Sequence, residues 1–184
     1  MERNVVFIAL FAALIAALGL IPKLTLAFGV PITAQSLGVM LCGTILGAKR
    51  GALAVLLFLG LTLIGLPLLS GGRGGIGLLA TPSVGFLIGW PISAFVTGWI
   101  VERVRTPALA VVATIASVIG CIIVMYIFGI VGMAYTLDKP MLGAAKLVTA
   151  FIPGDVIKAV LAGLITAALF KARPDSVFSR HEAD

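Results

Sequence analysis

The sequence predicts an all-α, polytopic membrane protein: a compact bundle of six transmembrane helices. Of its 184 residues, 61% are hydrophobic and only 11% are charged, whereas soluble domains carry about 45–50% apolar and about 25% charged residues. The apolar runs recur along the whole chain, and most of the charged residues fall between them. This composition excludes a soluble globular domain, a disordered chain and a disulfide-stapled secreted domain. Cys42 and Cys121, without C-x-x-C spacing, are interpreted as apolar core residues.

Charged residues, prolines and glycines delimit the first three spans. The first covers residues 5–20 and follows Glu2-Arg3; without a small-residue cleavage site it is interpreted as a retained helix rather than a signal peptide. A break around Pro22 and Pro31 precedes the second span, residues 33–48, which is barely long enough to cross a bilayer at about 1.5 Å per residue. The third, residues 52–69, follows Lys49-Arg50-Gly51.

The remaining spans follow a glycine-rich loop over residues 70–77. The fourth covers residues 84–101 and ends at a basic segment, and the fifth covers residues 109–131. A connection over residues 135–152 leads to the last span, residues 153–170. We therefore expect one membrane domain over residues 1–172 and a polar cytoplasmic tail over residues 173–184.

The basic residues between the spans predict the orientation. Placing both termini in the cytoplasm puts Arg3, Lys49, Arg50, Arg103, Arg105, Lys171, Arg173 and Arg180 on that side. The opposite side then holds only Lys23, Arg73, Lys139 and Lys146. The positive-inside bias favours this arrangement in a cytoplasmic (inner) membrane. The net charge of +6 is accordingly interpreted as a topology signal and not as a sign of nucleic-acid binding.

Asp155 and Lys158 are the ionisable residues that fall clearly inside an expected span. Three residues apart, they share one face of the last helix. Each costs about 2.5–3.5 kcal/mol at mid-membrane, so neither is expected to face lipid. Pro153 suits the first turn of that helix, and Asp155 then lies near its positive N-terminal end. The pair predicts a polar pocket opening outward; an ion pair that only holds helices together stays open as the alternative.

Arg73 and its neighbouring glycines are the second candidate. Backbone amides of Gly74 and Gly75 can approach a ligand closely, and the Arg73 guanidinium suits a carboxylate; a flexible exposed turn is the alternative.

Gln35 follows Thr33, a candidate helix cap, and can donate to or accept from a polar ligand. Among the aromatic residues, Phe86 is singled out because it closely follows the outer loop.

Ala9, Ala13 and Ala17 form a small-xxx-small stripe on the first helix. Such a stripe either packs inside the bundle or forms a docking face for another membrane protein. The sequence offers no catalytic set: its single histidine, His181, lies in the polar tail, and no His/Glu spacing suits a metal. We expect neither an enzyme nor a metal site.

Several spaced motifs resemble the BioY family, the biotin-specific substrate-binding (S) components of energy-coupling factor transporters. In order they are Pro31-x-Thr33-x-Gln35, Gly65-Leu66-Pro67, Ser70-Gly-Gly-Arg-Gly-Gly75, Thr81-Pro82, Gly85-Phe86 and Pro153-Gly154-Asp155-x-x-Lys158. The resemblance covers roughly residues 1–172. It implies a six-helix bundle with a biotin pocket near the outer face.

The resemblance also implies a ligand and partners. The ureido ring of biotin matches Asp155 and Lys158, and its carboxylate suits Arg73, although the two ends can be exchanged. The Ala9/Ala13/Ala17 stripe would dock on an energy-coupling transmembrane subunit with two ABC-type ATPases. ATP is then used only by those partners, and this chain needs no cofactor. Self-association into a homo-oligomer stays open.

One segment departs from the family pattern. Where Gly-Pro-Thr-Gly-Gly-Tyr is expected, the chain has Ala80-Thr81-Pro82-Ser83-Val84-Gly85-Phe86. The lost tyrosine hydroxyl and glycine argue against a polar ligand contact from this segment. Two other functions stay open: an S component or carrier for another vitamin, and a structural subunit in which the Asp155–Lys158 pair only holds helices.

Overall fold

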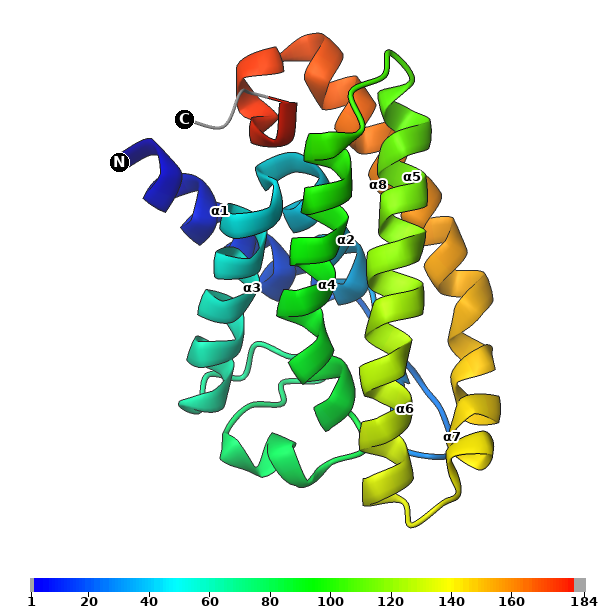
Figure 1. The fold of residues 1–184 in the computed structure, drawn as a ribbon. Helices are drawn as coiled ribbons and strands as arrows, with labels where there is room; N and C mark the ends of the chain where they lie inside the picture. Colours follow the sequence, from blue (N-terminus) through cyan, green and yellow to red (C-terminus); the bar gives the residue numbers. More distant parts are fainter. Residues whose placement is uncertain (1, 181–184) are drawn as a thin grey trace.

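The structure is a computed structural model that describes residues 2–180. This part of the chain folds into six helical rods joined by loops and turns (Figure 1). The first four are α1 (Glu2–Leu18), α2 (Gln35–Leu46), α3 (Ala48–Leu63) and α4 (Val84–Arg103). The fifth joins α5 (Leu109–Val118), the π-helical segment η2 (Ile119–Val124) and α6 (Met125–Thr136). The sixth joins α7 (Met141–Val148), the 3-10 turn η3 (Thr149–Phe151) and α8 (Ile152–Ala172). The prediction of a six-helix, all-α chain is confirmed.

Three of these rods are long and apolar enough to cross a membrane: Val84–Arg103, Leu109–Thr136 and Met141–Ala172. The others are shorter, and α2 has only 12 residues, about 18 Å at 1.5 Å per residue. Every residue of α2 except Leu37 is buried. Because neighbouring helices surround α2, its length does not need to match the thickness of the lipid bilayer. The chain is a multi-pass membrane protein.

Two expected boundaries differ from the structure. The basic triplet Lys49-Arg50-Gly51 lies inside α3, because the break falls at Gly47, whose φ of +84° disfavours other residues. The third helix ends at Leu63, and residues 64–69, which were expected to complete that span, form a loop instead. The expected connection over residues 135–152 is also mostly helical, since it contains α7.

The described part of the C-terminal tail folds back on the bundle. Two 3-10 turns, η4 (Pro174–Ser176) and η5 (Phe178–Arg180), pack near the start of α1 (Figure 1). Val177 and Ser179 are fully buried, and the Ser179 hydroxyl donates to the Thr44 carbonyl of α2 at 2.5 Å. The polar composition of residues 173–184 predicts a polar tail but gives no sign that Val177 and Ser179 are buried. His181 lies outside the described residues.

The opposite end of the bundle carries the loops that cover the site. Two short antiparallel strands, β1 (Leu24–Thr25) and β2 (Pro31–Ile32), connect α1 to α2. After α3 the chain makes a tight turn in which Leu69 and Arg73 pair backbone to backbone. The 3-10 helix η1 (Ile76–Ala80) then leads into α4. The start of α8 lies at this same end (Figure 1).

Candidate binding cavity

A cavity lies beneath these loops, between the loop-covered ends of the helices. It is open to solvent at its mouth, and the space inside it that a water molecule can reach is about 60 Å³. Most of its wall is apolar, and a few polar side chains interrupt that wall. The polar and aromatic residues that line it include Gln35, Ser36, Arg73, Ser83, Phe86, Trp90, Phe151, Asp155 and Lys158.

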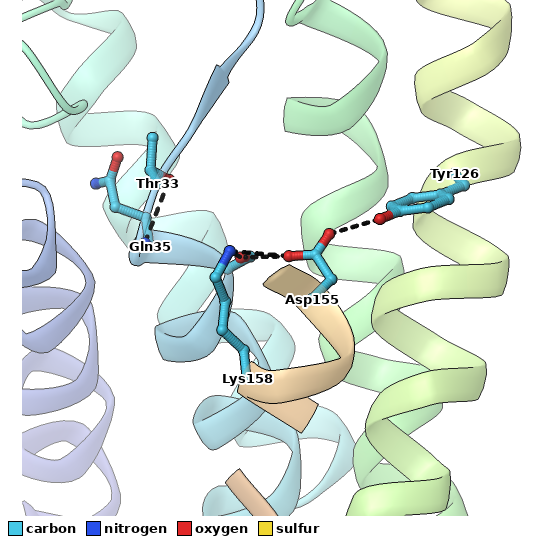
Figure 2. A network of polar contacts seen from close by, with 6 residues as sticks. Thr33, Gln35, Tyr126, Asp155 and Lys158 are labelled. Carbon is cyan, nitrogen blue, oxygen red and sulfur yellow. Dashed lines mark hydrogen bonds and ion pairs between the residues drawn. The ribbon is translucent and has the colours of Figure 1, made fainter. Parts of the chain in front are cut away.

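Asp155 is the centre of the polar network in the cavity wall (Figure 2). Its Oδ1 accepts hydrogen bonds from Lys158 Nζ at 2.9 Å and from Ser36 Oγ at 3.2 Å. Its Oδ2 accepts one from the Tyr126 hydroxyl at 2.7 Å. Lys158 Nζ also donates to Ser36 Oγ at 2.9 Å. The Asp155 side chain is only 6% exposed and that of Lys158 15%, so the predicted pair is a buried, hydrogen-bonded ion pair on the cavity wall.

Three elements bring this network together. Pro153 occupies the first turn of α8, as expected, and Asp155 lies in that turn, where the helix dipole favours a carboxylate. Ser36 is in the first turn of α2. Tyr126 follows the π-helical segment η2 by two residues, and the wider turn of a π-helix changes the direction of the side chains that follow.

Gln35 is buried in the wall but bonds to the protein's own backbone. Its Nε2 donates to the carbonyls of Ile15 at 3.1 Å and Leu68 at 3.0 Å. Its Oε1 accepts from the Ser70 N–H at 2.9 Å. The side chain therefore fixes the end of α1 and the Arg73 loop against the start of α2.

Arg73 lines the cavity from the loop above it. Its Nε donates to the Ser70 carbonyl at 3.3 Å, and Lys23 Nζ donates to the same oxygen at 3.3 Å. Partial burial lowers the pKa of the Arg73 guanidinium from its ordinary value, but a guanidinium remains cationic at neutral pH. The remaining guanidinium N–H groups of Arg73 can bind an anionic group of a ligand.

The two glycines beside Arg73 shape its loop and do not line the cavity. A Cβ on Gly74 would collide with the Leu66 carbonyl. Gly75 has a φ of +88°, and its N–H donates to the Thr62 carbonyl at 2.8 Å. Thr33, the candidate cap, precedes the N-cap residue Ala34 and accepts from the Gln35 N–H at 3.3 Å.

Aromatic rings form the apolar walls. Phe86 and Trp90 lie four residues apart on α4 and so share one face of it. The Phe86 ring centroid lies 5.7 Å from that of Phe151 and 6.3 Å from that of Tyr126. Of the aromatic candidates in the sequence, only Phe86 was singled out; Trp90, Tyr126 and Phe151 were interpreted as packing or interfacial residues, and Ser36 was not identified. The four-residue spacing of Phe86 and Trp90 was a usable signal, whereas nothing local distinguishes Ser36 or Tyr126 from packing residues.

The alanine stripe of α1 faces outward. Ala9, Ala13 and Ala17 are exposed, whereas the neighbouring Ala12 is buried and Ala16 partly buried. The bundle is therefore packed through the second pair of alanines, and the first stripe is left uncovered by the described part of the chain.

Comparison with known proteins identifies the family of this fold and cavity. The model of the BioY family matches residues 2–175. A biotin transporter BioY of Rhodobacter capsulatus is 51% identical over 189 aligned positions, covering 98% of this chain and 100% of the relative. That of Rhizobium etli is 52% identical over 178 positions, covering 94% and 95%.

A solved structure agrees with these sequence relatives. The crystal structure of the S-component for biotin from an ECF-type ABC transporter superposes with a TM-score of 0.87 at 33% identity, covering 92% of each chain. The sequence relatives are named as transporters rather than enzymes. The sequence, the fold and these comparisons together show that the chain belongs to the BioY family.

Proposed function

We propose that the chain is a high-affinity biotin-binding S component of an ECF-type transporter. It captures biotin in the cavity beneath the outer loops. It then delivers the vitamin across the cytoplasmic membrane together with an ATPase-driven energy-coupling module. The observation that carries this proposal is the buried, hydrogen-bonded Asp155–Lys158 pair in the wall of an otherwise mostly apolar cavity. Family membership names the ligand that this chemistry suits.

The ureido ring of biotin suits the polar network. Its N–H groups need acceptors, and a carboxylate offers about four lone-pair sites. Three of the sites on Asp155 already accept from protein donors, which leaves one site for one ring N–H. The ring carbonyl needs a donor, and Lys158 has a third N–H beyond the two it uses. Ser36 and Tyr126 hold the Asp155 carboxylate in place, so binding requires little rearrangement.

The rest of biotin suits the remaining wall. Phe86, Trp90 and Phe151 give apolar contact to the ring sulfur and the aliphatic chain, and Arg73 pairs with the carboxylate. Gln35, Gly74 and Gly75 contribute by shaping the loop that carries Arg73. A ligand held by charge at one end and by the ureido network at the other is selected for its length as well as its chemistry.

The partner subunits meet the chain from the membrane and from the cytoplasm. We propose that residues 1–172 form the binding domain, with both termini cytoplasmic. The exposed Ala9/Ala13/Ala17 face of α1 then docks on the energy-coupling transmembrane subunit, since small residues let two helices approach closely in lipid. Two ABC-type ATPases attached to that subunit use ATP.

Titration of labelled biotin into the purified protein tests the proposed function. Saturable binding at nanomolar to micromolar biotin is expected, and unlabelled biotin should displace the label while a panel of other vitamins should not. Absence of saturable binding would contradict the proposal. Biotin uptake by cells that express the chain with and without an energy-coupling module measures the dependence on partners.

A further inference from the structure

Three buried serine hydroxyls have no hydrogen-bond partner within the described residues: those of Ser70, Ser83 and Ser117. A buried hydroxyl without a partner loses its hydrogen bonds to water and gains nothing in return. Of these three residues, only Ser83 lines the cavity. A ligand in the cavity is therefore the group that can supply the missing partner of Ser83.

The position of Ser83 makes this lack of a partner unusual. Ser83 is the N-cap residue of α4, where a serine side chain normally accepts from a backbone N–H of the first helical turn. Here it makes no such bond, although the residue is only 6% exposed. Its hydroxyl needs only rotation about χ1 to turn toward a ligand.

The surroundings of Ser83 indicate which end of the ligand it meets. Phe86, one helical turn or about 4.5 Å further along α4, packs beside the Tyr126 ring that bonds Asp155. Ser83 therefore lies nearer the loop end of the cavity than the Asp155 network does. Arg73 comes from that loop, and the N-terminus of α4 adds a partial positive charge there.

We propose that the Ser83 hydroxyl donates a hydrogen bond to the carboxylate of the ligand, beside Arg73. This subsite rests on the proposed function and fixes the orientation of biotin, with its carboxylate under the loops and its ureido ring at Asp155. It also gives the segment over residues 80–86 a polar contact, although the departure of that segment from the family motif argues against one.

Biotin and its uncharged methyl ester distinguish this subsite from a general effect on binding. Their dissociation constants are measured by calorimetry on the wild-type protein and on Ser83→Ala. Loss of a hydrogen bond to a charged group should weaken biotin binding about tenfold or more, and ester binding by less than about threefold. Ser83→Thr, which keeps the hydroxyl, should bind biotin like the wild type. Ser117→Ala, which removes an equally buried and unpaired hydroxyl away from the cavity, should change neither constant.

Any result other than these contradicts either the Ser83 subsite or the proposed function. Unchanged biotin binding by Ser83→Ala, or an equal loss for biotin and ester, overturns the subsite while leaving the proposed function intact. Failure of the wild-type protein to bind biotin overturns the proposed function itself. The Tm of ligand-free Ser83→Ala should equal or exceed that of the wild type, and a lower Tm would show that the hydroxyl has a protein partner.

Discussion

Three donors converge on the Asp155 carboxylate: Lys158, Ser36 and Tyr126. A buried charge is tolerated only when its partners are in place. The three donors thus fix the positions of the carboxylate oxygens before a ligand arrives. In the proposed function this prior arrangement lets a ring N–H group of biotin bind a fixed carboxylate oxygen.

Breaking the pair on either side should abolish tight biotin binding. Asp155→Asn or Lys158→Met leaves the other charge buried without its partner, a loss of about 3–5 kcal/mol. We expect Tm to fall in both variants and to recover in the double variant Asp155→Leu/Lys158→Met, which still fails to bind biotin. Lys146→Met, at an exposed position of α7, is the control. Wild-type affinity in the double variant would reduce the pair to a structural role.

Tyr126→Phe removes one hydrogen bond and nothing else from the network. The Tyr126 hydroxyl donates to Asp155 Oδ2 at 2.7 Å, and a hydrogen bond to a charged group contributes about 1.5–3 kcal/mol. Biotin affinity should fall about tenfold or more in calorimetry. Tyr135→Phe, at a tyrosine that is 88% exposed, should bind as the wild type does. Equal affinities in the two variants would remove Tyr126 from the site.

At the scale of elements, loop geometry decides where Arg73 lies. The pairing of Leu69 with Arg73 and the bonds of Gln35 to Leu68 and Ser70 fix the loop. Gly74 crosses the Leu66 carbonyl so closely that no side chain fits there. The glycines of this loop are needed for the path of the chain rather than for contact with a ligand.

Gly74→Ala should therefore displace Arg73 and weaken biotin binding, because its Cβ overlaps the Leu66 carbonyl. Gly77→Ala is the matched control, since a Cβ at Gly77 meets nothing within 4 Å. Fluorescence or calorimetric titration with biotin compares the two. If Gly74→Ala bound biotin normally, either the loop would adapt or Arg73 would not contact the ligand.

The sequence predicts this fold better than it predicts the site. Long apolar runs determine six helices, and charges near a membrane helix end are conspicuous enough to identify Asp155 and Lys158. The break at Gly47 was missed because the neighbouring Lys49 and Arg50 appeared to end the helix. Ser36 was not identified and Tyr126 was interpreted as a packing or interfacial residue, because their roles depend on contacts 119 and 29 residues away along the chain, which no local pattern contains.

Gln35 illustrates the opposite difficulty. A glutamine at the outer start of a buried helix is a reasonable candidate for a ligand contact. In the structure both its amide nitrogen and its oxygen bond to backbone groups of other segments. Sequence identifies the residue as polar and buried, but only the arrangement of the neighbouring loops assigns its hydrogen bonds.

At the scale of the whole molecule, the basic residues lie at the two ends of the bundle in unequal numbers. Arg3, Arg50, Arg105 and Arg180 all contact the C-terminal turns or the loop beside them. Lys23 and Arg73 meet at the opposite end, on the Ser70 carbonyl. The end that carries the start of α1 and the C-terminal turns is thus the strongly basic one, as the predicted orientation requires.

Reporter fusions test that orientation. A green fluorescent protein fused after the C-terminus should fluoresce, and an alkaline phosphatase at the same position should be inactive, because the positive-inside bias keeps this end in the cytoplasm. A phosphatase inserted in the loop near Lys139 serves as the control and should be active. The reverse pattern would place the cavity mouth on the cytoplasmic side and contradict capture from outside.

The packing of the C-terminal turns against α1 has a consequence for chain connectivity. Arg3 donates to the Asp175 carbonyl, and the Phe7 and Phe178 rings meet edge to face with centroids 4.8 Å apart. The segments over residues 3–7 and 175–178 therefore lie side by side, so a short linker would bridge the ends of the described chain. A circular permutant opened at the exposed segment near Pro107 would then retain all six rods, the loops and the cavity, since bundle architecture does not depend on where the chain begins.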